Sequence, residues 1–479
     1  MGKDARTPKG AEHLPVGLRD FDVSFIGVCV PQIWIYCVAH RMDGALGEVA
    51  LGVPLYSALT LAMAVCLALS LRGRLPVRAP GIAWSLAVLQ GAATVLLVAP
   101  ELFPSLAGAP GVPLAAALCA GAGVAWLYLQ WAPFFASLDT KSIVACVFIA
   151  MAAGSALKVP LDLAPAPVAA ALLCLMPALS VILARRAEAR PRPAAAPPRL
   201  FHEENPTAVP WRILFAVGVY SFAIGAVKGV PVAADPVPFA ALTLVHHAVE
   251  ILLALGLLWW VFSLGRPLRF SALWRAVLLF TAATLFFLPW AGPVWAPWLQ
   301  LGAAIAQTLV VMLLWAMLAD VAHHTSAAPC TVFASGWIAY SLPLVLGEVA
   351  GSLAGTAPDR GLYVAVLAYG VTVTVVLALS DGTFSQRRIF ADLGGASPAP
   401  SAFASLDARC EELGAARGLT SREVEVLRMI VKGRSKSYIA ENLFISENTV
   451  RSHSKHIYQK LDVHSKQEVL DLLGMGEGD

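Results

Sequence analysis

The stretch Trp298–Ala319, WLQLGAAIAQTLVVMLLWAMLA, carries no charged side chain, and its polar side chains are confined to two glutamines and one threonine. A helix of this length rises about 33 Å, which is enough to cross the hydrocarbon core of a bilayer, about 30 Å thick. A water-soluble helix needs a polar face, and this stretch has none. The sequence therefore predicts a membrane-spanning helix here.

Eleven other apolar stretches are long enough, or nearly so, to cross a bilayer in the same way. The twelve predicted spans are Phe21–Ala39, Val49–Leu71, Gly81–Ala99, Val112–Leu129, Ser142–Leu157, Pro165–Ala184, Trp211–Val227, Val237–Leu264, Ser271–Trp290, Trp298–Ala319, Thr331–Val349 and Leu362–Leu379. The Pro-rich and Arg-rich segment 185–210 divides them six and six, so we expect two halves, 21–184 and 211–380, joined by a cytoplasmic linker. The predicted fold class is all-α, a polytopic membrane helix bundle of about twelve spans.

The composition excludes a soluble globular protein for most of the chain. Of the 479 residues, 58% are hydrophobic and 14% are charged, whereas ordinary soluble domains are about 25% charged. The same hydrophobicity excludes disorder. A formal net charge of +3 is too small to indicate a polyanionic partner for the whole chain, so charge is informative only segment by segment.

Neither cysteine spacing nor sequence motifs indicate a catalytic or metal centre. The eight cysteines are far apart and form no Cys-x-x-Cys pair, which argues against a disulfide framework and a zinc site. The sequence also lacks a phosphate-binding lysine loop, a Gly-x-Ser-x-Gly elbow, a His-Glu-x-x-His motif and a dinucleotide fingerprint. We therefore expect a non-enzyme that needs no cofactor and no metal.

The distribution of Lys and Arg between the spans predicts the orientation. If the N-terminal segment 1–20 is cytoplasmic, seventeen of these residues lie on the cytoplasmic side and four on the other, Lys158 being one of the four. The positive-inside rule favours that arrangement. An even number of spans then places the C-terminus in the cytoplasm as well, and the predicted location is the inner (cytoplasmic) membrane, crossed many times.

The composition changes after residue 380. Residues 381–418 are rich in Gly, Pro, Ser and Ala, which predicts a linker with a short helix near Leu406–Ala416, and residues 419–479 form a separate domain. Thr420 and Glu423 have the spacing of a capping box, and Gly433 ends the helix that begins there. Ser446 caps a longer helix, on which an apolar stripe is formed by Val450, Ile457 and Leu461.

A short helix followed by a turn and a long helix with a basic outer face is the helix-turn-helix arrangement, in which the long helix enters the DNA major groove. Arg451 and Lys455 lie four residues apart on the outer face, with Ser452 between them and His453 and His456 beside them. The domain as a whole has nine basic and nine acidic residues. A small four-helix domain that binds protein fits the same spacing.

Several pieces of this domain resemble the LuxR/NarL-type helix-turn-helix: Leu419-Thr-Ser-Arg-Glu423, Gly433-x-Ser435, Leu443-Phe-Ile-Ser446, Thr449-Val450-Arg451 and Lys460-Leu461. The resemblance implies base contacts from Arg451, Ser452 and Lys455, and dimers formed through Gln467–Leu473. It implies phosphate contacts from Thr449, His453 and His456. The usual Asn-Lys-Glu is replaced by Lys436-Ser437-Tyr438, so Lys436 stands one residue away from the family's phosphate-contacting lysine.

The membrane half resembles the major facilitator superfamily in its six-plus-six plan, although Leu71–Arg78 lacks the Gly-x-x-x-Asp start of that family's signature. Ionisable side chains inside spans are costly and tend to be functional. The candidate ligand-binding residues are His246, His247, Glu250, Trp337 and Tyr340, since His246 and Glu250 share a helix face and the two aromatic side chains can stack on a ring. A satisfied His–Glu pair that merely joins helices is the alternative.

Three ionisable residues near the end of the tenth span, Asp320, His323 and His324, are predicted to lie in a cytoplasmic loop. Together the two parts of the chain favour a membrane-embedded one-component transcriptional regulator that senses a signal or small molecule and binds DNA. Its expected partners are DNA, membrane lipid, a small-molecule ligand and, on DNA, a second copy of the chain. The alternative is a major-facilitator-like secondary transporter with a regulatory DNA-binding tail.

Overall fold

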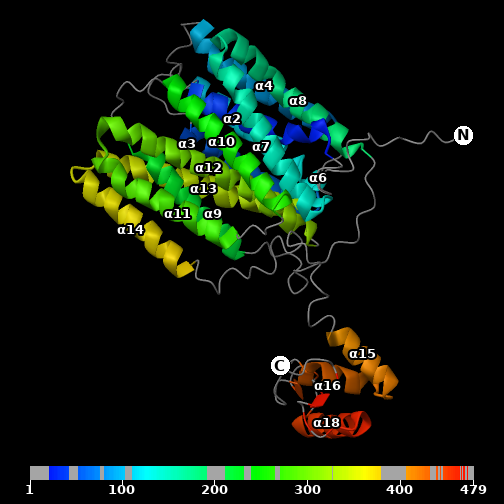
Figure 1. The fold of residues 1–479 in the computed structure, drawn as a ribbon. Coiled ribbons are helices and arrows are strands. Elements are labelled where there is room, and N and C mark those ends of the chain that lie inside the picture. Colours follow the sequence, from blue (N-terminus) through cyan, green and yellow to red (C-terminus); the bar gives the residue numbers. More distant parts are fainter. Residues whose placement is uncertain are drawn as a thin grey trace, which may run out of the picture. The chain divides into compact units, whose positions relative to one another are not determined.

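The computed structural model describes residues 21–41, 52–75, 80–102, 111–190, 211–230, 239–264, 270–325, 327–378, 406–431, 439–440, 443, 446–463, 465, 468–469 and 472. Within these ranges the chain is helical and contains no β-strand, so the all-α prediction is confirmed for the described residues. The chain divides into two compact units, Met1–Leu393 and Gly394–Asp479. The first unit is the large helix bundle in Figure 1, and the second is the small group of helices α15, α16 and α18.

The first unit is a bundle of long apolar helices with short helical segments between them. Its elements are η2 (Val23–Cys29), α2 (Val30–Arg41), α3 (Gly52–Leu71), α4 (Pro80–Leu102), α5 (Gly111–Leu129), α6 (Ala132–Ala136), α7 (Thr140–Leu163), α8 (Ala166–Glu188), α9 (Trp211–Gly229), α10 (Phe239–Phe262), α11 (Phe270–Phe287), η4 (Leu288–Trp290), α12 (Gly292–His323), α13 (Pro329–Thr356) and α14 (Arg360–Ala378).

Seven helical segments of the described part are long and apolar enough to cross a membrane, and five further apolar segments are shorter. Large apolar side chains cover the outside of the bundle: Leu252 and Leu353 are each 68% exposed, and Tyr369 is 72% exposed. In water such a surface would be a liability, whereas in a bilayer it contacts lipid. The first unit is therefore suited to a membrane, as the composition predicts.

Several helices continue past the predicted spans, and two of these extensions change the expected place of a buried charged residue. α7 continues past residue 157 to Leu163, so Lys158 is a buried residue of the helix rather than part of an outer loop. α12 continues to His323, so Asp320 and His323 lie in a helix rather than in a cytoplasmic loop, and His324 is its C-cap. In both places the charged side chain has a partner inside the bundle, and therefore it does not end the helix.

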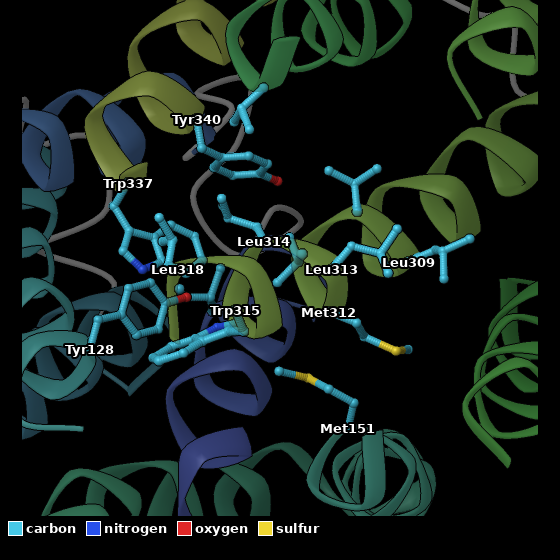
Figure 2. Packing of buried hydrophobic residues seen from close by; sticks show 14 of the residues in the cluster. Tyr128, Met151, Leu309, Met312, Leu313, Leu314, Trp315, Leu318, Trp337 and Tyr340 are labelled. Carbon is cyan, nitrogen blue, oxygen red and sulfur yellow. The ribbon is translucent and has the colours of Figure 1, made fainter. Parts of the chain in front are cut away.

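The core of the bundle is built around α12 (Figure 2). Along its buried side lie Leu309, Met312, Leu313, Trp315 and Leu318. The Trp315 ring packs edge-on against Tyr128 of α5 and Trp337 of α13, with centroid distances of 5.3 Å and 5.6 Å. Tyr128 and Trp337 stack on each other at 4.3 Å. One aromatic cluster thus joins a helix of the first half to two helices of the second.

Helices α9 and α13 approach until their backbones touch. Each helix carries two glycines four residues apart, Gly225 and Gly229 on α9 and Gly347 and Gly351 on α13. A Cβ atom at any of these four positions would collide with main-chain atoms of the facing helix. This spacing is the small-xxx-small pattern that lets membrane helices pack closely, and only glycine fits at the contact.

The second unit is built from α15 (Leu406–Ala416), α16 (Ser421–Val431) and α18 (Glu447–Leu461). Its core is apolar and includes Val426, Leu427, Val450, Ile457 and Leu461, together with Cys410 of α15. Helix α15, expected from the sequence inside the linker, therefore packs onto this unit. Residues 432–438, which include the predicted helix end Gly433, lie outside the described residues, and so does most of Gln467–Leu473, the segment that the resemblance assigns to dimer formation.

Candidate functional site

Helix α18 has defined ends. Ser446 is its N-cap, and the Ser446 hydroxyl oxygen accepts a hydrogen bond from the Thr449 amide at 3.1 Å. Glu447 in the first turn suits the positive end of the helix dipole. At the other end Asp462 adopts the left-handed conformation with φ 57°, which lets its amide donate back to Gln459. These local signals fix the helix where the sequence predicts it.

The two faces of α18 differ sharply. Val450, Ser454, Ile457 and Leu461 are buried, and the Ser454 hydroxyl donates to the Val450 carbonyl at 2.8 Å. The remaining face presents the residues predicted to contact DNA. Arg451, Ser452, Lys455 and His456 are exposed, and Thr449 and His453 are half-buried. Lys436 lies outside the described residues.

Arg451 and Lys455 line the same shallow surface groove, together with Ser454, Tyr458, Gln459, Asp462 and Val463. The groove runs along the exposed side of α18, so both cations can be presented to one stretch of a polyanion. An α-helix fits the DNA major groove, and α18 presents these two basic side chains on its exposed face.

An ion pair between exposed Lys460 and buried Glu423 holds α18 against α16. The Lys460 ammonium donates to the Glu423 carboxylate at 2.7 Å and to the Gly418 carbonyl at 3.1 Å. Glu423 also accepts from the Thr420 amide at 2.8 Å, so the predicted capping box is present. Burial disfavours the charged form of Glu423, but hydrogen bonds from Lys460 and Thr420 outweigh it and lower the pKa of Glu423 to about 2.

Three further contacts brace this unit, and sequence reasoning missed all of them. Arg422 donates to the Leu443 carbonyl at 2.6 Å and to Glu425 at 2.6 Å, which ties α16 to the segment before α18. Arg428 of α16 pairs with Glu411 of α15. The Arg422–Glu425 pair has the i,i+3 spacing of a helix and was visible in the sequence. The Arg422–Leu443 and Arg428–Glu411 contacts join different elements, so no periodic pattern predicts them.

The second unit has known relatives. The model of "Bacterial regulatory proteins, luxR family" matches residues 417–473. The spore germination protein GerE of Bacillus subtilis (strain 168) is 48% identical over 60 residues, which make up 12% of this chain and 81% of GerE. The oxygen regulatory protein NreC of Staphylococcus carnosus (strain TM300) is 47% identical over 55 residues, 12% of this chain and 25% of NreC. The chain thus spans most of GerE but only a quarter of NreC.

The C-terminal unit is therefore a LuxR-type DNA-binding domain of a transcriptional regulator, and the chain belongs to the luxR family of bacterial regulatory proteins. This family likeness is confined to the last part of the chain. What the apolar bundle does has to be argued from its own residues.

The bundle contains a cluster of ionisable side chains around Glu250. His246 Nε2 lies 2.8 Å from Glu250 Oε1, and His247 Nδ1 lies 3.3 Å from Glu250 Oε2. From α7, Ser155 donates to Glu250 at 2.7 Å and the Lys158 ammonium lies 3.4 Å away. The structure thus brings the predicted trio together and adds two residues that the sequence did not connect with it.

His247 bridges two acids. Its Nδ1 faces Glu250, and its Nε2 lies 3.0 Å from Asp162 Oδ2. Each ring nitrogen of His247 therefore faces a carboxylate oxygen. Lys158 contacts the same Glu250, so oppositely charged side chain types are grouped in a region where an unpaired charge is costly.

Beside this cluster lies a cavity between the two halves of the bundle. Among the five candidate ligand residues, His246, Trp337 and Tyr340 line the cavity, whereas His247 and Glu250 are absent from its walls. Both are fully buried and contact Lys158 or Asp162 instead. The predicted site is therefore split between residues that face the cavity and residues that hold those in place.

Proposed function

We propose that this protein is a membrane-embedded one-component transcriptional regulator. The observation that carries the proposal is the combination in one chain of a LuxR-type domain, with basic residues exposed on α18, and a bundle of apolar helices that contains a cavity lined by aromatic and polar side chains. The bundle receives the signal, and the C-terminal domain binds DNA. No separate messenger is then needed between them.

We propose that all twelve apolar segments span the inner membrane, six in each half, with both termini in the cytoplasm. Seven of the helical segments have the required length, and the five shorter ones are comparably apolar over part of a span. The cytoplasmic side is set by the excess of Lys and Arg there. This orientation gives the C-terminal domain access to the chromosome.

On DNA we expect base contacts from Arg451, Ser452 and Lys455, and phosphate contacts from Thr449, His453 and His456, with Lys436 as a further phosphate contact. Two copies are expected to bind together, because recognition helices about 34–36 Å apart read adjacent major grooves of a two-fold site. Leu472, in the predicted last helix, is 45% exposed and available for an apolar contact between copies.

Mapping of bound DNA in cells tests the proposal. The full-length chain, recovered from the membrane fraction after cross-linking, should enrich discrete chromosomal sites, and Arg451→Ala should lose most of that enrichment. Arg409→Ala, which removes an exposed cation from α15, is the matched control and should retain it. Equal enrichment by the two variants would count against DNA reading by α18.

A transporter with a regulatory tail would also need a cavity between two halves. Reconstituted vesicles distinguish the two functions. A transporter driven by the gradient of a coupled ion accumulates solute inside the vesicle, whereas a sensor binds the solute without net uptake. Saturable uptake would require the proposal to be replaced by this alternative.

A further inference from the structure

The cavity beside Lys158 has walls from both halves of the bundle. Its lining includes Gln32 and Tyr36 of α2, Tyr128 of α5, Lys158 of α7, His246 of α10, Gln307 of α12 and Tyr340 of α13. The space open to the centres of water-sized spheres is about 80 Å³. At roughly 10–15 Å³ for each water, this volume admits on the order of six waters, or a compact molecule with a single ring.

Aromatic rings form much of the wall. Tyr36, Tyr56, Tyr128, Trp337 and Tyr340 all line the cavity. Tyr128 is stacked on Trp337, and the Trp337 and Tyr340 rings meet edge-on at 5.5 Å. Rings in fixed, mutually supported orientations favour a planar apolar guest, which can stack or meet them edge-on.

Two glutamines prepare hydrogen-bond donors on this wall. The Gln32 amide nitrogen donates to the Tyr128 hydroxyl at 2.7 Å, and the Gln307 amide nitrogen donates to the Tyr340 hydroxyl at 2.7 Å. An amide nitrogen only donates, so each phenol oxygen accepts from it and keeps its own hydrogen to donate. The arrangement presents hydroxyl donors to an acceptor on the guest, one from each half of the bundle.

The ionisable side chains on the described walls are cationic or neutral. They are Lys158, Lys228, His246, Cys29 and four tyrosines, and no Asp or Glu is among the described lining residues. Lys158 is held by Glu250 at the long distance of 3.4 Å and lies 4.5 Å from the centre of the Tyr36 ring. Glu250 is shared with Ser155 and both histidines. The remaining ammonium hydrogens of Lys158 can therefore meet a negative group in the cavity.

We propose that the cavity binds a small aromatic carboxylate: the carboxylate is met by Lys158 and the tyrosine hydroxyls, and the ring packs against Trp337 and the tyrosine rings. The proposal rests on the sensing role given to the bundle and names the chemical class of its ligand. The charged cluster behind Lys158 keeps the ammonium in place while the cavity is empty.

Equilibrium binding to the purified full-length protein in lipid nanodiscs tests the proposal. Radiolabelled benzoate is the probe, and benzamide and cyclohexanecarboxylate are the competitors, because one lacks the charge and the other lacks the aromatic ring. Benzoate should bind saturably, and each competitor should be at least about ten-fold weaker than unlabelled benzoate. Equal competition by benzamide, equal competition by cyclohexanecarboxylate, or no binding of benzoate would each overturn the proposal.

Lys158→Gln should reduce benzoate affinity by about ten-fold or more, because a charge-assisted contact is lost. Lys141→Gln, on the same helix but outside the cavity lining, is the matched control and should bind as the unmodified chain does. Tyr340→Phe removes only a hydroxyl, so it tests the site even if Lys158→Gln fails to fold, and it should weaken benzoate binding several-fold. Unchanged affinity in Tyr340→Phe and Lys158→Gln would contradict the assignment.

The binding assay is independent of DNA, so the two proposals fail separately. Benzoate binding without any effect on DNA occupancy would leave the ligand class standing and refute the sensing role. Specific DNA binding by a chain that binds none of the three compounds would refute the ligand class and leave the DNA-binding function standing.

Discussion

Glu423 links pH to the stability of the DNA-binding domain. Its pKa is about 2 in the folded chain and 4.5 without these contacts. A lowered pKa stabilises the folded state above the unfolded value and loses that contribution as pH falls from about 4.5 toward about 2. Acid should therefore loosen the contact between α16 and α18, and neutral pH should preserve it.

Glu423→Gln should destabilise this domain at pH 7 by about 1–3 kcal/mol, because Lys460 keeps its charge and loses the carboxylate. Hydrogen exchange of the full-length protein, followed in peptides from α16 and α18, measures the effect. Glu425→Gln is the matched control: Glu425 is 46% exposed in its side chain, and its pair with Arg422 is near the surface, so its loss should cost under about 1 kcal/mol. Equal effects would contradict the role of the Glu423–Lys460 pair.

Lys436 is expected to act through charge on a phosphate, whereas Arg451 is expected to read bases. Lys436→Ala should reduce by about one the slope of log affinity against log salt concentration, because one phosphate contact is lost. Arg451→Ala should weaken binding to the preferred DNA site by about 1–3 kcal/mol, and should reduce the difference in affinity between that site and other sequences. Titrations of defined duplexes at several salt concentrations distinguish the two, and identical behaviour of both variants would contradict this division of roles.

Helices α16 and α18 show how much of the structure can be predicted from residues that are close in sequence. The Ser446 cap, the capping box at Thr420 and the stripe of Val450, Ile457 and Leu461 are properties of neighbours in sequence, and all are present in the structure. The ends of α7 and α12 could not be predicted in the same way. Lys158 and Asp320 resemble span ends until their partners, Glu250 and Thr140, are known, and those partners are 92 and 180 residues away.

The candidate site was predictable in part for the same reason. The spacing of His246 and Glu250 on one helix is visible in the sequence, and so is the apolar character of their surroundings. The contributions of Ser155, Lys158 and Asp162 depend on α7 packing beside α10, which no periodicity encodes. The glycines of α9 and α13 are different, because their four-residue spacing is visible in the sequence and is typical of closely packed membrane helices.

The α9–α13 contact predicts a sharp response to side-chain size. Gly347→Leu should destabilise the bundle by about 1–3 kcal/mol or more, because the new side chain collides with the α9 main chain near Phe222. Gly256→Leu on α10 is the matched control, since a Cβ there meets nothing within 4 Å. Thermal unfolding in detergent measures both, and equal midpoints would show that the two backbones are not in tight contact.

For the whole molecule, the proposed orientation is the assumption on which DNA binding depends. A fluorescent protein fused after residue 479 should fluoresce, and alkaline phosphatase fused there should be inactive, because both report a cytoplasmic C-terminus. Alkaline phosphatase inserted in segment 103–110, proposed to face the opposite side, should be active and serves as the control. An active phosphatase at the C-terminus would contradict chromosomal DNA as the partner.

The glycine contact also limits how the bundle can respond to a guest. Trp337 and Tyr340 belong to α13, and α13 packs closely against α9. We therefore expect α9 and α13 to move as one rigid body. Its other flank meets α3 through hydroxyl pairs, Thr60 with Ser341 at 2.7 Å and Ser70 with Thr331 at 2.8 Å. Hydroxyl groups can exchange hydrogen-bond partners at little cost. The α3–α13 interface can therefore shift, whereas the close glycine contact between α9 and α13 cannot. When a guest enlarges the cavity, we therefore expect α9 and α13 to slide together along α3. The displacement would reach the cytoplasmic end of the bundle without bending α9 or α13.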